Sequence, residues 1–115
     1  MNRHLNATEL YHHPELKFNC AQAIAYKYAS SEEAGQAKAL EFKKYGGGNA
    51  PDGLCGALHA GLERLSHDQR AEIELKNVFK TSASSLACHE IRKENQLSCK
   101  GCVQLVDEFL YSQLS

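Results

Sequence analysis

The sequence predicts an all-α fold, a compact bundle of about five to seven helices in a single domain over residues 1–115. Apolar residues recur mainly at helical spacing, and the strict alternation of a half-buried strand is nearly absent. Only two prolines punctuate the chain. A domain of this length buries roughly two-thirds of the surface of its unfolded chain, so we expect a core that folds without covalent cross-links.

Three helices are expected before the glycine run at 46–48. Their predicted ranges are 8–13, 15–29 and 30–44. Pro14 separates the first two because it cannot donate the i→i−4 hydrogen bond. Ser30 and Glu33 fit a capping box at the start of the third helix. We expect that helix to stop at Gly46-Gly47-Gly48, because glycine readily adopts the left-handed conformation that ends helices.

Four further helices are expected after Pro51-Asp52. Ser66 and Gln69 fit a second capping box, and Ser98 is the expected cap of the last helix. A turn is predicted at 81–85, followed by a short helix over 86–91. The predicted inward residues of these helices are Leu54, Leu58, Gly61, Leu62 and Leu65, then Ala71, Leu75, Val78 and Phe79, and finally Val103, Val106, Phe109, Leu110 and Leu114.

Charge and hydropathy exclude several classes of protein. The 13 basic and 14 acidic residues are interspersed and give a net charge of −1, so no basic stripe indicates nucleic-acid binding. No apolar run approaches the ~20 residues of a membrane helix, and the N-terminus does not resemble a secretory signal. We therefore expect a cytoplasmic protein without membrane insertion. In that reducing compartment cysteines more often bind metals or act in catalysis than form structural disulfides.

Five cysteines in 115 residues are the strongest chemical signal. Each precedes an apolar residue of its own expected helix by three or four positions, which puts every thiol on or beside an inward face. The pairs are Cys20 with Ile24, Cys55 with Leu58, Cys88 with Ile91, Cys99 with Val103 and Cys102 with Val106. A buried cysteine can also serve merely as a small apolar residue. The set as a whole favours a shared site inside the bundle.

Two other arrangements of donors stay open. Cys99-Lys100-Gly101-Cys102 is a C-x-x-C motif, and at a helix N-terminus such a pair is typical of thiol–disulfide exchange or of a metal site. His59 follows Cys55 by four residues and could face the same site as a zinc ligand, although no spacing here matches a zinc finger. No Ser/His/Asp arrangement, acid–base pair or dinucleotide motif is visible. We expect no independent catalytic activity on an organic substrate.

The glycine run lacks the Lys-Ser or Lys-Thr that completes a phosphate-binding loop. Glycines do, however, permit close backbone approach to a cofactor and leave N–H groups that can hydrogen-bond to cluster sulfur. Gly46, Gly47, Gly48 and Gly56 are therefore candidate cofactor-binding residues.

The contexts of four cysteines resemble the C_GCAxxG_C_C family of small redox-active helical proteins over residues 17–110. The matching segments are Asn19-Cys20-Ala21-Gln22-Ala23, Tyr45-Gly46-Gly47-Gly48 with Cys55-Gly56-Ala57, Cys88-His89-Glu90-Ile91, and Cys102 with Val106-Asp107. The chain departs from the family where Ala60 replaces a glycine, with Gly61 next. Cys99 is an addition. A similar domain accompanies the haem domain of split-Soret cytochromes c, but no C-x-x-C-H haem site is present here.

The resemblance implies that Cys20, Cys55, Cys88 and Cys102 bind an iron–sulfur cluster, of the 2Fe–2S type, for electron transfer or redox sensing with a redox partner protein. Two alternatives remain at this stage. One is a thiol–disulfide redox protein that uses pairs such as Cys99 and Cys102, and the other is a zinc-stabilised interaction domain. The surplus thiol of Cys99 is also compatible with a homodimer in which two subunits share ligands.

Overall fold

The computed structural model describes residues 6–46, 49–94 and 97–114, except the side chains of Arg92 and Leu114. These residues form seven α-helices and no strand, which confirms the predicted all-α bundle. The helices are α1 (Ala7–Leu10), α2 (Cys20–Lys27), α3 (Glu32–Phe42), α4 (Gly56–Arg64), α5 (Gln69–Ala83), α6 (Cys88–Glu94) and α7 (Cys99–Leu114), with 3₁₀ turns at Lys43–Tyr45 and Pro51–Gly53. None of the helices in the described ranges is both long and apolar enough to cross a membrane.

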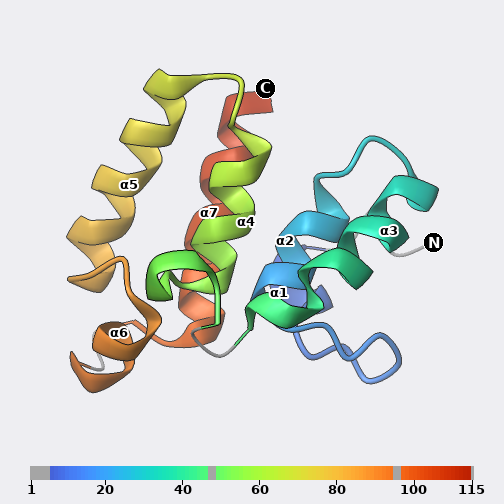
Figure 1. Cartoon of the computed structure of the whole chain (residues 1–115), viewed down its shortest axis with the longest axis horizontal. Coiled ribbons are helices and arrows are strands. Elements are labelled where there is room, and N and C mark those ends of the chain that lie inside the picture. Colours follow the sequence, from blue (N-terminus) through green and yellow to red (C-terminus); the bar gives the residue numbers. More distant parts are fainter. Residues whose placement is uncertain (1–5, 47–48, 95–96, 115) are drawn as a thin grey trace.

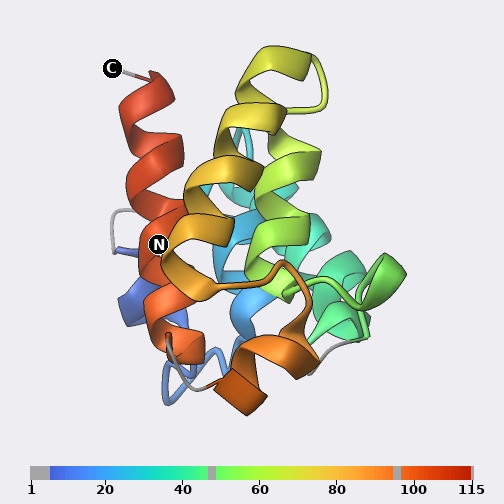
Figure 2. The same cartoon turned by 90° about the vertical axis from the view of Figure 1, so that its left-hand side faces the viewer.

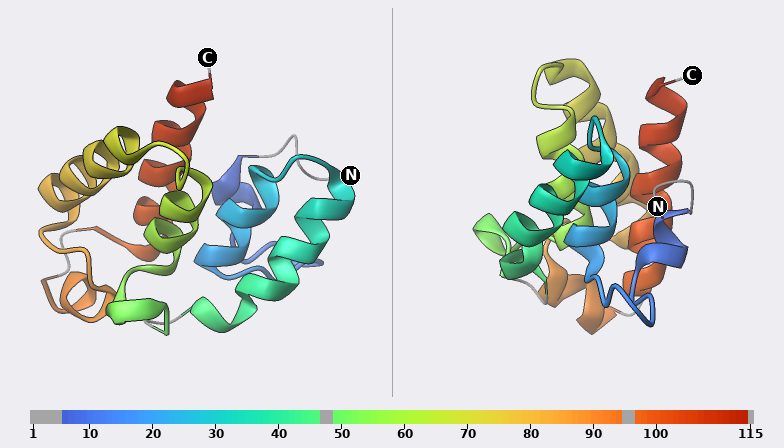
Figure 3. Two further views of the ribbon diagram at one scale, coloured as in Figure 1. Left: turned by 45° about the horizontal axis from the view of Figure 1, so that its top comes forward. Right: turned by 90° about the vertical axis from the view of Figure 1, so that its right-hand side faces the viewer.

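The helices form two groups that meet along α2. In Figure 1, α4, α5 and α7 stand side by side on one side of the molecule, and α1, α2 and α3 lie on the other. Helix α2 packs against α1, α3, α4 and α7, and α7 packs against α1, α2, α4 and α5. The right-hand view of Figure 3 shows α2 between α3 and α1. Helices α2 and α7 therefore join the two groups.

The core lies where α2, α4, α5 and α7 meet. Its largest fully buried side chains include Phe79, Leu75, Leu58, Ile24 and Leu110. Burial of such side chains contributes roughly 1.5–3 kcal/mol each relative to exposure. The predicted helical spacing therefore identified the main inward residues of α4, α5 and α7.

The close approach of α4 to its neighbours depends on Gly61. A Cβ atom at this position would lie 2.7 Å from Val106 Cγ1 and 3.1 Å from Leu75 Cδ2. The glycine one position after Ala60 thus provides the tight helix contact in this region.

Helix α2 begins later than predicted. The predicted start at residue 15 is wrong because the chain forms a turn before Asn19. Within this turn Lys17 has a φ of 55°, and the N–H of His12 donates to the carbonyl of Phe18 at 2.7 Å. Asn19 then caps α2 by accepting from the N–H of Gln22, whose side chain accepts from the N–H of Asn19 in return. The first helix is likewise shorter than predicted and ends at Leu10.

Both predicted capping boxes in the middle of the chain are misplaced. Helix α3 is capped by Ser31, whose Oγ accepts from the N–H of Ala34, and not by Ser30. Helix α5 is capped by Asp68, whose carboxylate accepts from the N–H of Ala71, and not by Ser66. In each case the cap is a nearby residue whose side chain can also cap a helix. That residue has the extended backbone that a cap requires.

Two predictions near the end of α5 also need correction. Helix α5 continues to Ala83, so the predicted turn at 81–85 begins too early. The C-cap residue of α5 is Ser84, which lies in the left-handed region with a φ of 73°. Val78 is 38 % exposed and does not belong to the inward face. The expected cap of α7 is confirmed, since Ser98 Oγ accepts from the N–H of Gly101 at 3.0 Å.

A buried carboxylate fastens α1 and α2 to α7. Asp107 accepts hydrogen bonds from the N–H of Ala7 at 3.0 Å and from the Tyr28 hydroxyl, and it pairs with Lys27 at 3.1 Å. Burial and the hydrogen bond to this carboxylate raise the pKa of Tyr28. Because its partners come from two other helices, Asp107 fixes how the N-terminal group sits on α7.

We expect Asp107→Asn to lower the free energy of unfolding by about 2–4 kcal/mol, because it leaves the Lys27 ammonium without its buried counter-ion. Glu41→Gln is the control, since it removes an exposed pair with Lys38 at 3.7 Å that contributes about 0.5 kcal/mol or less. Urea denaturation measures both variants. Equal midpoints for the two would contradict the role assigned to Asp107.

Candidate thiol centre

All five cysteines lie at the N-terminal ends of helices. Cys20, Cys88 and Cys99 are the first residues of α2, α6 and α7, Cys55 is the N-cap of α4, and Cys102 is in the first turn of α7. In Figures 1 and 2, the N-terminal ends of α4 and α7 and the short helix α6 lie at one end of the molecule. The unpaired N–H groups of helix N-termini favour negative charge. This end therefore combines sulfur with groups that stabilise anions.

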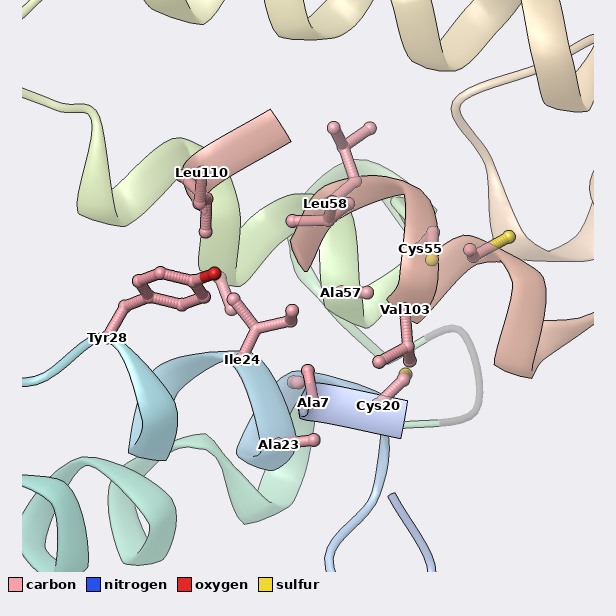
Figure 4. Close-up of a cluster of buried hydrophobic side chains, with 14 of the residues drawn as sticks. Ala7, Cys20, Ala23, Ile24, Tyr28, Cys55, Ala57, Leu58, Val103 and Leu110 are labelled. Carbon is pink, nitrogen blue, oxygen red and sulfur yellow. The ribbon is translucent and has the colours of Figure 1, made fainter. Parts of the chain in front are cut away.

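Three of the thiols contact one another in series. The thiol of Cys20 lies beside that of Cys55, and the thiol of Cys55 lies beside that of Cys102, close enough for each pair to interact electrostatically. The exposed fractions of the three residues are 8 %, 5 % and 1 %. Figure 4 shows Cys20 and Cys55 at one end of the core cluster, beside Val103, with Tyr28 and Leu110 at the other end. The structure thus brings together three of the four predicted ligands, each from a different helix.

The contact between Cys20 and α4 requires a glycine. A Cβ atom at Gly56 would lie 2.7 Å from the carbonyl oxygen of Tyr45 and 2.8 Å from Cys20 Sγ. Either distance is shorter than real Cβ contacts, and the carbonyl belongs to the backbone. Gly56 therefore allows the first turns of α2 and α4 to meet at the Cys20 sulfur.

Cys88, the fourth predicted ligand, follows a segment that runs beside Cys55. The N–H of Cys55 donates to the carbonyl of Leu86 at 2.9 Å, and Leu54 and Ala87 form an isolated antiparallel bridge. Cys88 comes next in the chain and is 8 % exposed. The backbone just before Cys88 therefore runs next to Cys55.

The thiols of Cys20 and Cys55 are held in the protonated form. The hydrogen bond to Cys55 and burial raise the pKa of Cys20 above its ordinary value. The hydrogen bond to Cys102 raises the pKa of Cys55 to about 12, and burial adds to this although the contact with Cys20 lowers it. Backbone N–H groups of Ala57 and Leu58 favour the thiolate and oppose these shifts. These backbone N–H groups in the first turn of α4 therefore stabilise the thiolate forms of Cys20 and Cys55 once the thiols have lost their protons.

Cys99 occupies a different position from the other four cysteines. It is partly exposed at the first position of α7, whereas Cys102 in the same turn is almost fully buried. All five cysteines are present as thiols. The distinction between four predicted site residues and one additional thiol therefore corresponds to a difference in burial.

His59 packs against aromatic rings beside α4. Its ring lies 4.7 Å from the ring centroid of Tyr45 in an edge-on arrangement and 5.7 Å from that of Phe42. His59 is therefore a half-buried member of an aromatic cluster.

The first residue of the glycine run differs from its predicted conformation. Gly46 has a φ of −77° and a ψ of 163°, so the prediction of a left-handed helix end is wrong at this residue. Gly46 is required instead by close packing, because a Cβ atom there would lie 2.7 Å from Asn19 Nδ2. Gly47 and Gly48 lie outside the described residues. Of the two predicted cofactor-binding glycines that the structure describes, Gly56 is the one that lies against a thiol.

Within the described ranges, no group of three or more His, Cys, Asp or Glu side chains is arranged to hold a metal ion. The contacts among Cys20, Cys55 and Cys102 run in series. A groove of about 790 Å³ is lined by residues of α2, of α3 and of the turn before α2, among them Tyr26 and Phe18, and by no cysteine.

Comparison of the chain with protein-family models gave no match, and neither did comparison with curated proteins or with solved structures.

Sequence reasoning missed the contributions of Tyr45, Ala57 and Leu58, which act through backbone groups. A cysteine at an N-cap, followed by the amides of the next turn, is the signal that could have indicated the last two. The Tyr45 carbonyl gave no signal, because its contact depends on how two separate segments meet.

We expect Gly56→Ala to lower the free energy of unfolding by about 1–3 kcal/mol, because the new methyl group overlaps a carbonyl and a sulfur. Gly101→Ala is the matched control in a helical first turn, since the methyl group there meets the flexible end of Leu97 at 2.7 Å. Thermal or urea unfolding compares the variants. If Gly56→Ala were as stable as Gly101→Ala, the close contact at Cys20 would be contradicted.

The raised pKa values of Cys20 and Cys55 predict a loss of stability at alkaline pH. The folded state keeps protons that the unfolded thiols release above the ordinary value of 9.0, so stability falls between pH 9 and about 12. The slope is at most about 1.4 kcal/mol per pH unit for each thiol.

The double variant Cys20→Ala/Cys55→Ala should show a smaller decline over this range than the wild type, and Cys99→Ala should decline as the wild type does. Urea midpoints measured from pH 8 to pH 11 provide the comparison. Parallel curves for the wild type and the double variant would contradict the assigned shifts.

Proposed function

We propose that this chain is a small cysteine-based redox protein, and that Cys20, Cys55, Cys88 and Cys102 hold an iron–sulfur cluster for electron transfer or redox sensing. The observation that carries the proposal is the contact of three buried thiols from three helices. The hydrogen bond between Cys55 and Leu86 adds support, because it draws the segment before Cys88 to the same place.

The residues present suit a cluster in donor type and number. Iron–sulfur clusters of the 2Fe–2S and 4Fe–4S types are held by four cysteine thiolates. Backbone N–H groups near such sulfurs tune the cluster, and Ala57 and Leu58 offer such groups here. Because the described thiols lie in series, they must rotate and lose their protons before they can surround a common centre.

When bound, an iron–sulfur cluster supplies a centre that accepts and releases single electrons. The chain contributes the environment of that centre. The low exposure of Cys20, Cys55 and Cys102 excludes water, and Gly56 lets the backbone approach sulfur. Electrons must come from and go to a redox partner protein. The cytoplasmic location and the absence of nucleic-acid binding remain predictions, as does the homodimer.

The proposal is tested by anaerobic purification followed by iron and acid-labile sulfide analysis and visible absorption. We expect iron and sulfide in comparable amounts, and a loss of at least about tenfold in both when Cys20, Cys55, Cys88 or Cys102 is changed to Ser. Cys99→Ser is the control and should retain the cluster. Protein that contains neither iron nor sulfide, and takes up neither on reconstitution, would refute the proposal. Stoichiometric zinc would instead identify a zinc-stabilised domain.

The direct contact of the thiols favours a second candidate, a thiol–disulfide redox protein. Oxidation of Cys20 and Cys55 to a disulfide would release two electrons and two protons to an external disulfide, which becomes two thiols. Thiol trapping in defined redox buffers separates the two candidates. Reversible loss of two buried thiols from metal-free protein, with no cluster under anaerobic conditions, would favour the disulfide.

A further inference from the structure

The first turn of α7 carries a partly exposed thiol and a buried thiol. Cys99 is at its first position and Cys102 at its fourth, where the exposed fraction is 1 %. Residues three apart in an α-helix have Cα atoms about 5 Å apart, which is within the range that a disulfide spans. Cys99 and Cys102 are therefore close enough to be joined with little movement of the backbone.

The local structure of this turn supports exchange at Cys99. Ser98 caps the helix through the N–H of Gly101 at 3.0 Å, and the carbonyl of Ser98 accepts from the N–H of Cys102 at 2.9 Å. The turn is thus well formed around the pair. Lys100, which is exposed, lies between the two cysteines. An external disulfide can approach Cys99 from solvent, whereas Cys102 lies beneath it in contact with Cys55.

We propose that Cys99 is the thiol through which the buried centre is oxidised, and that its disulfide with Cys102 removes Cys102 from that centre. The regulatory consequence rests on the proposed function, because it matters only if Cys102 belongs to the centre. The disulfide itself does not depend on a bound cluster.

The reaction uses a low-molecular-weight disulfide as the oxidant. The thiolate of Cys99 attacks one sulfur of that disulfide, forms a mixed disulfide and releases the first small thiolate. The thiolate of Cys102 then attacks Cys99 Sγ, and the second small thiolate leaves. Two protons from the protein thiols end on the two small thiolates, and the two electrons reduce the external disulfide. The oxidised protein cannot offer Cys102 as a ligand until the new bond is reduced.

The test uses the full-length, metal-free, reduced chain and oxidised glutathione as the probe. The remaining thiols are alkylated after each time point, and the protein is digested with trypsin without reduction. Cleavage after Lys93 and Lys100 puts Cys99 in residues 94–100 and Cys102 in residues 101–115. A disulfide between them therefore appears in the mass spectrum as two peptides joined together.

We expect these joined peptides to be the first protein disulfide formed. Cys99→Ser should consume oxidised glutathione at least about tenfold more slowly, because access controls the rate of exchange. Gln104→Ala, at an exposed position of the same helix, is the control and should form the joined peptides at the wild-type rate. Circular dichroism verifies that each variant is helical, and Cys99→Ala serves as a second variant if Cys99→Ser does not fold.

A first disulfide between Cys20 and Cys55, or a wild-type rate in both Cys99 variants, would overturn the proposal. Neither result depends on metal content, because the protein is metal-free. Iron and sulfide analysis of separately purified protein reports on the proposed function, so that failure of one proposal is distinguishable from failure of the other.

Discussion

The structure depends on the close contact between the first turns of α2 and α4. At this point the Cys20 sulfur, the Tyr45 carbonyl and Gly56 meet at distances that leave no room for a side chain. The contact places the amides at the start of α4 against sulfur. It also sets the position of Cys55, from which the thiol contacts continue to Cys102. Both the packing of the two helical groups and the chemistry of the thiols follow from it.

The same arrangement explains why the thiols are protonated and yet suited to bind an electrophile. Burial and neighbouring thiols favour the neutral form of Cys20 and Cys55, whereas the amides of α4 favour the thiolate. If the centre binds a metal or reacts with an oxidant as proposed, its thiols would lose their protons, and the amides would then stabilise the resulting sulfur ligands or thiolates. Asp107 has a structural role outside the thiol centre. It holds α1 and α2 on α7 through Ala7, Tyr28 and Lys27.

The sequence predicted the helical class because apolar spacing is a local signal, and Leu75 and Phe79 illustrate it. Exact helix starts were less predictable because several residues compete for each cap. Ser30 and Ser31 have the same side chain, and Ser31 is the cap because its backbone is extended and its Oγ accepts from the N–H of Ala34. The break before α2 depends on the contact of His12 with Phe18, which no local pattern revealed.

The candidate site was predictable in composition but not in geometry. Helical spacing put Cys20, Cys55 and Cys102 on inward faces, and each of them is buried. Which thiols touch depends on how separate helices pack, and so does the requirement for Gly56 at the Tyr45 carbonyl. The difference between Cys99 and Cys102 depends likewise on which side of α7 its neighbours cover.

Titration of the reduced, metal-free chain with Co²⁺ tests most directly whether four thiols form one site, because thiolate ligands give cobalt strong charge-transfer absorption. We expect one Co²⁺ per chain with tetrahedral thiolate absorption, retained in Cys99→Ser and lost or strongly weakened in Cys88→Ser. A spectrum unchanged by Cys88→Ser, or abolished by Cys99→Ser, would contradict the assignment of Cys20, Cys55, Cys88 and Cys102 to a single centre.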